Sequence, residues 1–349
     1  MHNQSHSESS YYQLQRTSDS FRLTQALRPI PVPAANQVLI ALSAASLNYR
    51  DLLILQNAGQ DTVSGQIPLS DASGTVVAVG SEVRRWQVGD RVAANFFSNW
   101  YDGKYQARYY LDSALGGNMT EGVLAQHIIA NEDAIVAIPE HLNFQQAATL
   151  PCAAVTAWHA LFERGQLQAG ETVLIQGTGG VALFGLQLAV AQGATVIITS
   201  SSDAKLAKAR ALGAAHTINY RTHENWDEIV LALTQGAGVD HILELGGPDT
   251  YTKSINALAS GGQIHQIGVL TGFGSTPNLW PLQAKNAQIN GILVGSVAHF
   301  AALNRFLSQH QIVPVIDREF NFLQVQAAYD YLTSAAHFGK IVINLPSYS

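Results

Sequence analysis

The sequence predicts an α/β protein in which an all-β domain precedes a domain built on a parallel sheet. Its 349 residues are enough for about two domains. From Tyr11 to about Leu150, short apolar runs alternate with turn residues, which is typical of strands. After Pro151, apolar strands alternate with helical segments, and this alternation is the pattern of consecutive βαβ units.

Apolar periodicity and turn residues set the expected elements. In the first part, strands are expected at 38–42, 75–79 and 91–94. In the second part, strands are expected at 172–176, 195–199, 217–220, 239–245 and 263–269, and helices at 181–192, 204–212, 225–234 and 250–259. Near the C-terminus, helices are expected around 301–309 and 323–334, and a closing strand at 340–345. Gly193 and Gly213 are expected to end the helices that they follow.

Composition limits the class of protein and its partners. Hydrophobic residues make up 47% of the chain and charged residues 13%, which indicates a folded, core-rich protein. The net charge of −6 and the absence of any Lys/Arg run argue against nucleic acid or an anionic membrane as partner and favour a small-molecule substrate.

The termini and cysteine content limit its location and metal chemistry. The first ten residues are polar and are expected to be disordered. No apolar stretch resembles a signal peptide or a membrane span, so we expect a cytoplasmic protein. The single cysteine, Cys152, excludes an intrachain disulfide and a cysteine-rich zinc lobe.

A glycine-rich loop follows the strand expected at 172–176. Gly177, Gly179 and Ala182 match the spacing G-x-G-x-x-G/A between a strand and a helix. Gly177 suits a tight turn, Gly179 and Gly180 allow a pyrophosphate to approach the backbone, and the helix N-terminus favours an anion. The alternative is a glycine-rich turn without a ligand.

The end of the next strand bears on which dinucleotide is bound. Residues 200–202 are all serine, so no carboxylate is placed there to bind the ribose 2′-hydroxyl of NAD. Asp203 is interpreted as the N-cap of the following helix. Ser201 and Lys205 could bind a 2′-phosphate, which favours NADP(H) over NAD(H), although Lys205 could equally be a solvated helix residue.

These residues resemble the medium-chain dehydrogenase/reductase superfamily from about Tyr11 to Leu345. The motifs that carry the resemblance are Asn48-Tyr49-Arg50-Asp51, residues 74–80 with 88–92, 122–125, 148–158, the glycine loop and 338–340. The resemblance implies a GroES-like β-barrel catalytic domain at 1–150, completed by about 297–349. It also implies an NADP-binding Rossmann domain at 151–296 with a doubly wound parallel sheet.

The same resemblance bears on zinc. Zinc-dependent members would carry a cysteine at Asn48, a Gly-His-Glu at residues 69–71 and a third ligand near Cys152. Here Cys152 and Asp71 supply at most two good ligands, fewer than the three that a catalytic zinc needs. We therefore expect no zinc, and the chain resembles the zinc-free, quinone oxidoreductase-like branch.

Site residues are carried over by position. Asn48 is expected to position substrate or cofactor, Asp51 to brace the catalytic cleft, and Tyr49 either to donate a proton or only to pack. The resemblance also implies a set of cofactor contacts. These are Thr156 near the carboxamide, Gly179, Gly180 and Val181 near the pyrophosphate, Ser201, Lys205 and Tyr220 near the adenosine phosphate, and Gly246, Ile267, Gly268 and Val269 on the nicotinamide side.

We therefore expect a zinc-independent reductase that transfers hydride from NADPH to a quinone or an α,β-unsaturated carbonyl, and by analogy a homodimer. Two alternatives remain. One is an alcohol dehydrogenase with unexpected metal ligands, and the other is a non-catalytic NADPH-binding sensor, since no obvious acid/base dyad is present. The aromatic residues 96–117 could cover the site, contact a partner chain or only pack.

Overall fold

The computed structural model describes residues 8–56, 63–272, 274 and 277–346. The chain divides into two compact units. Unit 1 contains Met1–Cys152 and Gly295–Ser349, and unit 2 contains Ala153–Val294. The expected domain limits, 1–150 with 297–349 and 151–296, lie within two residues of these units at each boundary.

Unit 1 is built on an antiparallel core with β3 at its centre. Its sheet has the order β14-β15-β3-β4-β5-β7, with β6 also paired to β3, and β1 and β2 form a separate hairpin. The strands are β1 (Glu8–Arg16), β2 (Phe21–Pro29), β3 (Gln37–Leu47), β4 (Asp71–Val79), β5 (Arg91–Ala94), β6 (His127–Asn131), β7 (Ile135–Ala137), β14 (Ile316–Asn321) and β15 (Lys340–Asn344).

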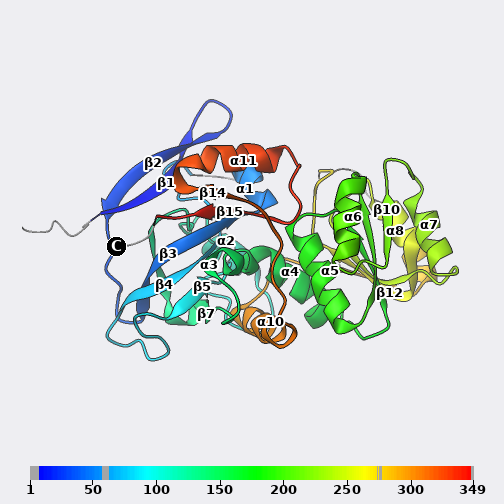
Figure 1. The fold of residues 1–349 in the computed structure, drawn as a ribbon, viewed down its shortest axis with the longest axis horizontal. Coiled ribbons are helices and arrows are strands. Elements are labelled where there is room, and N and C mark those ends of the chain that lie inside the picture. Colours follow the sequence, from blue (N-terminus) through cyan, green and yellow to red (C-terminus); the bar gives the residue numbers. More distant parts are fainter. Residues whose placement is uncertain (1–7, 57–62, 273, 275–276, 347–349) are drawn as a thin grey trace, which may run out of the picture. The chain divides into compact units, whose positions relative to one another are not determined.

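Helices of unit 1 surround this sheet, and α11 packs on β14 and β15 (Figure 1). The helices are α1 (Tyr49–Leu55), α2 (Ala107–Ser113), α3 (Phe144–Ala147), α10 (Val297–His310) and α11 (Val325–Thr333), with short 3-10 turns at Glu132–Ala134 and Phe322–Gln324 and a π-helical turn at Leu150–Ala154. The core joins apolar side chains of β3, such as Val38 and Ile40, with Tyr329 and Leu332 of α11. The C-terminal segment is therefore part of the core of unit 1.

The polar N-terminus is more ordered than expected. Strand β1 begins at Glu8, and Ser9 is fully buried opposite Arg28 of β2. The expectation of disorder is therefore wrong for residues 8–10, because pairing with β2 satisfies the backbone of this polar segment. Residues 1–7 lie outside the described part of the chain.

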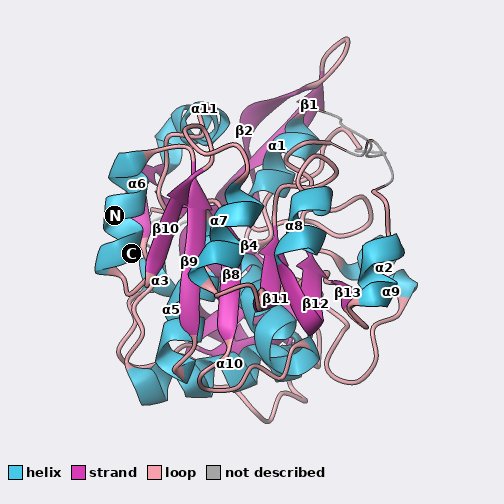
Figure 2. Ribbon diagram, turned by 90° about the vertical axis from the view of Figure 1, so that its right-hand side faces the viewer, coloured by secondary structure: helices cyan, strands magenta, loops and turns pink. Residues whose placement is uncertain are grey.

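Unit 2 is a doubly wound parallel sheet, as expected. Its six strands have the order β10-β9-β8-β11-β12-β13 (Figure 2). The first strand, β8, lies in the middle, β9 and β10 are added on one side of it, and β11 to β13 on the other, as in a Rossmann fold. Helices α5 and α6 cover one face of the sheet, and α7 and α8 cover the other (Figure 1). The strands are β8 (Thr172–Gln176), β9 (Thr195–Ser200), β10 (His216–Asn219), β11 (Val239–Glu244), β12 (Leu258–Gln266) and β13 (Gln288–Gly291).

Most helices of unit 2 match their expected positions, but the helical segment 155–164 was not expected, and further differences lie late in the unit. The helices are α4 (Val155–Trp158), α5 (Gly180–Gln192), α6 (Asp203–Ala211), α7 (Trp226–Leu233), α8 (Tyr251–Ala257) and α9 (Trp280–Ala284), with a π-helical turn at His159–Arg164. The helix expected at 250–259 is too long, because β12 starts at Leu258 directly after α8. The short α9 and the edge strand β13 were not expected, since their sequence has no clear periodicity.

The aromatic segment 96–117 packs within unit 1. Phe96, Phe97, Trp100 and Tyr109 are buried, and the rings of Trp100 and Tyr109 stack at 5.7 Å between centroids. The Trp100 carbonyl accepts a hydrogen bond from the Val297 N–H at the start of α10 (3.0 Å). Packing is therefore shown for these buried rings, whereas Tyr101 and Tyr105 are exposed, and a role of the segment in covering the site or contacting a partner chain stays a prediction.

No helix in the described part of the chain is both long enough and apolar enough to cross a membrane.

A substitution at Gly74 tests how closely the paired strands β3 and β4 approach each other. A Cβ added there would lie 2.1 Å from the Ala41 carbonyl oxygen, which is backbone and cannot move aside. We expect Gly74→Ala to lower the free energy of unfolding by about 2 kcal/mol or more, as measured by urea denaturation. Gly291→Ala in β13 is the matched control, because a Cβ there meets no atom within 4 Å. Equal effects of the two variants would contradict this account.

Candidate functional site

The glycine loop of unit 2 has the geometry that a pyrophosphate needs. It joins β8 to α5, and Gly177 adopts φ +77°, in the region that favours glycine. Gly179 is the N-cap of α5, and no side chain caps that helix N-terminus. A Cβ added at Gly177 or Gly179 would meet no atom within 4 Å, so the space beside the loop is open to a ligand. This loop therefore fits the diphosphate of a dinucleotide.

Tight packing holds α5 against the sheet below this loop. Ala182 and Gly185 are buried, and a Cβ added at Gly185 would lie 2.3 Å from Leu243 Cδ1. Small residues here let the helix axis approach β11 closely, which fixes the direction of the N-terminus. Val181, one of the expected pyrophosphate contacts, lies in the first turn of α5.

A buried polar network next to the loop was missed from the sequence. The Glu244 side chain, fully buried at the end of β11, accepts hydrogen bonds from the N–H groups of Gly246 (3.0 Å) and Gly247 (3.1 Å) and from Thr250 Oγ1 (2.6 Å). Gln176 Nε2, at the end of β8, also donates to it (2.7 Å). This network fixes the loop after β11 at the carboxyl edge of the sheet, where doubly wound folds bind ligands.

The residues expected on the nicotinamide side follow neighbouring strands. Ile267 and Gly268 both donate backbone hydrogen bonds to the Glu244 carbonyl (3.0 Å each), so they lie beside the end of β11. A Cβ on Gly268 would lie 2.1 Å from the Leu245 carbonyl oxygen, and this close approach requires glycine. The strand expected at 263–269 ends earlier, at Gln266, so Gly268 and Val269 are loop residues.

The residues expected near the adenosine phosphate also share one edge. Ser201 and Tyr220 directly follow β9 and β10, which pair in parallel, and Lys205 lies in the first turns of α6. The interpretation of Asp203 as the N-cap of α6 is wrong. The N-cap is Ser202, whose Oγ accepts a hydrogen bond from the Lys205 N–H (3.4 Å). Asp203 instead accepts a hydrogen bond from Asn219 Nδ2 (2.7 Å), because β10 ends beside the start of α6.

One further expected cofactor residue, Thr156, and one cation that was not expected, Arg221, remain to be placed. Thr156 is buried (4% exposed) in α4, between two π-helical turns. Arg221, an exposed cation directly after Tyr220, was missed because it lies in a loop without periodicity. It adds a second positive charge at the edge that carries Tyr220.

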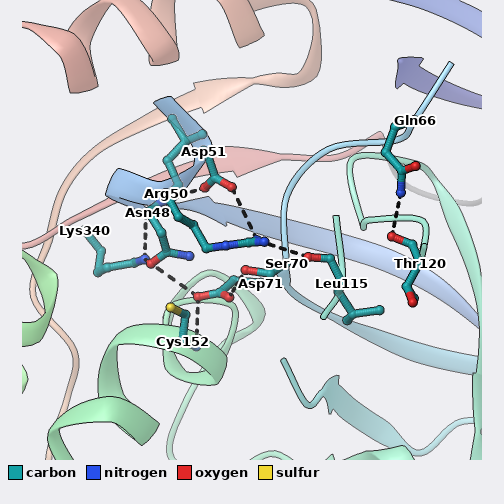
Figure 3. Close-up of polar contacts among 11 residues, drawn as sticks. Asn48, Arg50, Asp51, Gln66, Ser70, Asp71, Leu115, Thr120, Cys152 and Lys340 are labelled. Carbon is teal, nitrogen blue, oxygen red and sulfur yellow. Dashed lines mark hydrogen bonds and ion pairs between the residues drawn. The ribbon is translucent and has the colours of Figure 1, made fainter. Parts of the chain in front are cut away.

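Unit 1 contains a cluster of buried charges around the start of α1 (Figure 3). Asp51 is 2% exposed, and its Oδ2 accepts a hydrogen bond from the Asn48 N–H (2.7 Å). Arg50 Nη1 lies 4.0 Å from Asp51 Oδ1 and donates to the Leu115 carbonyl (3.0 Å). Asp51 thus braces the N-terminus of α1 and has a cation beside it.

Burial raises the pKa of Asp51 from 3.8 to about 6. The Arg50 guanidinium and the Asn48 N–H act in the opposite direction but do not cancel the effect of burial. The nearby Asp71 carboxylate raises this pKa further. The pKa of Asp51 therefore lies well above that of an exposed aspartate.

Asp71 joins a second strand to this cluster. It is fully buried at the start of β4, and it accepts hydrogen bonds from Ser70 Oγ (2.8 Å) and from the Cys152 N–H (3.1 Å). Lys340 Nζ lies 3.8 Å from Asp71 Oδ2 and 2.6 Å from Asn48 Oδ1 (Figure 3). Lys340 was not expected as a site residue, because no local pattern connects residue 340 with residue 48. Asp71 was considered only as a possible zinc ligand, and Ser70 only as part of the segment where zinc-dependent members carry Gly-His-Glu.

Cys152 as a whole residue is half-buried. Burial of the sulfur, together with the Asp71 carboxylate, raises the pKa of its thiol. A thiol that stays protonated is a poor nucleophile, so no nucleophilic role is assigned to Cys152. Tyr49 is 41% exposed, which does not support a role limited to core packing.

The donor set at the positions where zinc-dependent members would carry their ligands does not fit a catalytic zinc. Asn48 offers an amide whose oxygen is bound to the Lys340 ammonium, and Ser70 offers a hydroxyl. A cation inside the cluster opposes binding of a second one, and only Asp71 and Cys152 are good zinc ligands here. The described residues contain no group of three or more His, Cys, Asp or Glu side chains placed to hold a metal.

Comparison with known proteins gives the family. Residues 34–140 match the alcohol dehydrogenase GroES-like domain, and residues 180–309 match the zinc-binding dehydrogenase family. A zinc-type alcohol dehydrogenase-like protein of Schizosaccharomyces pombe is 42% identical over 94% of both chains. The chain belongs to the medium-chain dehydrogenase/reductase superfamily. The GroES-like assignment of unit 1 and the Rossmann assignment of unit 2 are therefore confirmed.

Other members of the superfamily agree with this fold. A crystal structure from Sinorhizobium meliloti 1021, provisionally assigned as an alcohol dehydrogenase, is 42% identical with a TM-score of 0.91, over 97% of this chain and 99% of that one. A quinone oxidoreductase of Mus musculus is 28% identical over 90% of this chain and 91% of its own. This member of the superfamily is therefore an oxidoreductase of the alcohol dehydrogenase-like type.

The raised pKa of Asp51 gives a pH prediction. The folded protein holds this proton more tightly than the unfolded chain, so the free energy of unfolding should fall as pH rises from about 4 to about 6. One such group changes the slope by at most about 1.4 kcal/mol per pH unit. We expect the difference between wild type and Asp51→Asn, measured by urea denaturation, to change across this window and to be constant above it.

Asp133→Asn is the control for this titration, because the Asp133 side chain is 51% exposed. Its difference from wild type should not follow the same curve. A wild-type minus Asp51→Asn difference that is flat from pH 4 to pH 7, or that changes only near the unfolded value of 3.8, would contradict the raised pKa.

Proposed function

We propose that this oxidoreductase is a zinc-independent reductase that uses NADPH to reduce a quinone or an α,β-unsaturated carbonyl compound. One observation carries the proposal. At the positions where the superfamily resemblance implies zinc ligands, the chain presents an amide and a carboxylate that are both held near the buried ammonium of Lys340. Such a site suits a carbonyl oxygen that accepts hydrogen bonds better than it suits a metal.

Unit 2 supplies the groups proposed to hold NADPH. When bound, NADPH supplies a hydride from its nicotinamide ring. The N–H groups at the start of α5 bind the diphosphate, and the open space beside Gly177 and Gly179 admits it. The cations of Lys205 and Arg221, with the Ser201 hydroxyl, bind the 2′-phosphate.

Unit 1 supplies the groups proposed to act on the substrate. As hydride is added to an electron-poor carbon, negative charge develops on the substrate oxygen and must be stabilised. The buried Asn48 Nδ2 has no hydrogen-bond partner among the described residues and can donate to that oxygen. The exposed Tyr49 hydroxyl, or a water molecule, can then supply the proton.

The comparisons favour a second candidate as well. The quinone oxidoreductase from mouse supports the reductase, whereas the more similar yeast and Sinorhizobium proteins carry alcohol dehydrogenase names. An alcohol dehydrogenase would need to oxidise an alcohol with NAD(P)⁺, and a zinc-dependent one would lose activity with a chelator. The two functions are therefore separable in one assay.

The deciding experiment follows NADPH absorbance with 1,4-benzoquinone and with 2-cyclohexen-1-one, each with and without 1,10-phenanthroline. We expect turnover that the chelator does not change, and no NADP⁺ reduction with 1-butanol. Chelator-sensitive oxidation of 1-butanol, with about one zinc per chain, would overturn the proposal in favour of the alcohol dehydrogenase. Tight NADPH binding with no turnover of any of these compounds would indicate the sensor protein instead.

The choice of NADPH over NADH gives a further prediction. Lys205→Ala and Arg221→Ala should each raise the KM for NADPH by about tenfold, because each removes a charged hydrogen bond to the 2′-phosphate. The KM for NADH should stay unchanged in both variants. Lys208→Ala, in the last turn of α6, is the matched control. A parallel rise for NADPH and NADH would mean that these cations do not read the 2′-phosphate.

A further inference from the structure

The ammonium of Lys340 is buried in unit 1, which is unusual for a lysine. Lys340 is the first residue of β15 and is 3% exposed, and the three residues after it are apolar. Its Nζ donates to the Leu47 carbonyl (2.7 Å) and to Asn48 Oδ1 (2.6 Å). Asp71 Oδ2 lies 3.8 Å away (Figure 3). A buried ammonium is costly unless it is paired, and here it is paired with one carboxylate and two neutral oxygens.

These contacts fix the orientation of the Asn48 side chain. An ammonium can only donate hydrogen bonds, so the side-chain atom of Asn48 that faces Nζ must be the oxygen. A flipped amide would place its NH₂ group against the NH₃⁺ group, which is repulsive. Nδ2 therefore points away from Lys340, and it is buried without a partner among the described residues. A buried N–H₂ group without an acceptor is unfavourable, and an incoming oxygen atom would satisfy it.

Asp71 keeps the ammonium in place. Its carboxylate is fixed by Ser70 Oγ (2.8 Å) and by the Cys152 N–H (3.1 Å), so it cannot rotate freely. The Leu47 carbonyl belongs to the backbone of β3 and is equally rigid. The ammonium therefore lies between fixed acceptors on β3 and β4. Its third acceptor is Oδ1 of Asn48, the residue just before α1.

We propose that Lys340 is a positioning residue that orients the Asn48 amide, so that the site recognises its substrate through an acceptor oxygen. This inference rests on the proposed function and narrows its substrate class to compounds with a carbonyl oxygen at the reacting end. The ammonium also polarises the amide through Oδ1, which strengthens Nδ2–H as a donor while charge builds on the substrate.

A double-mutant cycle tests this inference. Lys340→Met and Asn48→Ala should each lower kcat/KM for reduction of 2-cyclohexen-1-one by about 10- to 100-fold, mainly through kcat. The double variant should be no worse than the more damaged single variant, because both changes remove the same interaction. Lys340→Arg, which keeps a buried donor and its charge, should restore part of the activity. If the fold-losses in kcat/KM of the two single variants multiply in the double variant, or if kcat/KM of Lys340→Met equals that of wild type, the positioning role of Lys340 is overturned.

A matched control separates positioning from loss of stability. Lys285 in unit 2 also donates to backbone carbonyls, among them those of Ile255 (2.9 Å) and Asn256 (2.7 Å). Lys285→Met should lower the melting temperature without changing kcat/KM. The Kd for NADPH, measured by fluorescence, should be the same in Lys340→Met and wild type. A kcat/KM loss that appears equally in Lys285→Met would indicate a general effect of stability and overturn the proposal.

A measurement without turnover distinguishes failure of this inference from failure of the proposed function. The side-chain ¹⁵N–¹H signals of Asn48 can be assigned by their loss in Asn48→Ala. In Lys340→Met we expect these signals to shift and to split as the amide populates two orientations. Unchanged signals would overturn the positioning role. If the signals change but the wild type reduces neither benzoquinone nor cyclohexenone, the proposed function fails while the orientation of Asn48 by Lys340 stands.

Discussion

The pairing of β15 with β3 is the constraint on which the site of unit 1 depends. Ile341 pairs with Leu47, and this register places the side chain of Lys340 beside the end of β3 and the start of α1. The partners in this contact are almost three hundred residues apart in the chain. Without the return of the C-terminal strand to the first domain, the cluster would hold two buried aspartates and no buried ammonium to balance them.

The balance of charge in that cluster explains its composition. Asp51, Asp71 and Lys340 are all nearly inaccessible to solvent, and unpaired ions in such a place would be strongly unfavourable. The N–H groups of Asn48 and Cys152 and the Ser70 hydroxyl satisfy most of the carboxylate oxygens. The polar atoms left over, Asn48 Nδ2 and Asp51 Oδ1, lie at the start of α1. Polar capacity that the fold does not use is available to a ligand.

In unit 2 as well, buried polar side chains are satisfied by hydrogen bonds, here at the edge of the sheet. Gln176 and Glu244 end adjacent strands, and their mutual hydrogen bond and the backbone groups they hold fix the loops on which a dinucleotide would lie. Glycine is present in these loops for two different reasons. Gly177 and Gly179 leave open space, whereas Gly246 and Gly268 are required because neighbouring atoms of the chain would meet any Cβ. Only the first kind of glycine marks a ligand surface by itself.

The sequence alone determined the two-part architecture, the order of strands and helices in unit 2, and the glycine loop, because each of these depends on local periodicity or on a short motif. It also brought Asn48 and Asp51 forward through the superfamily resemblance. Tertiary structure decided the rest. The polar strand β1, the short β13, the contact of Asp203 with Asn219 and the meeting of Lys340 with Asn48 all depend on contacts between separate elements, which leave no pattern in the local sequence.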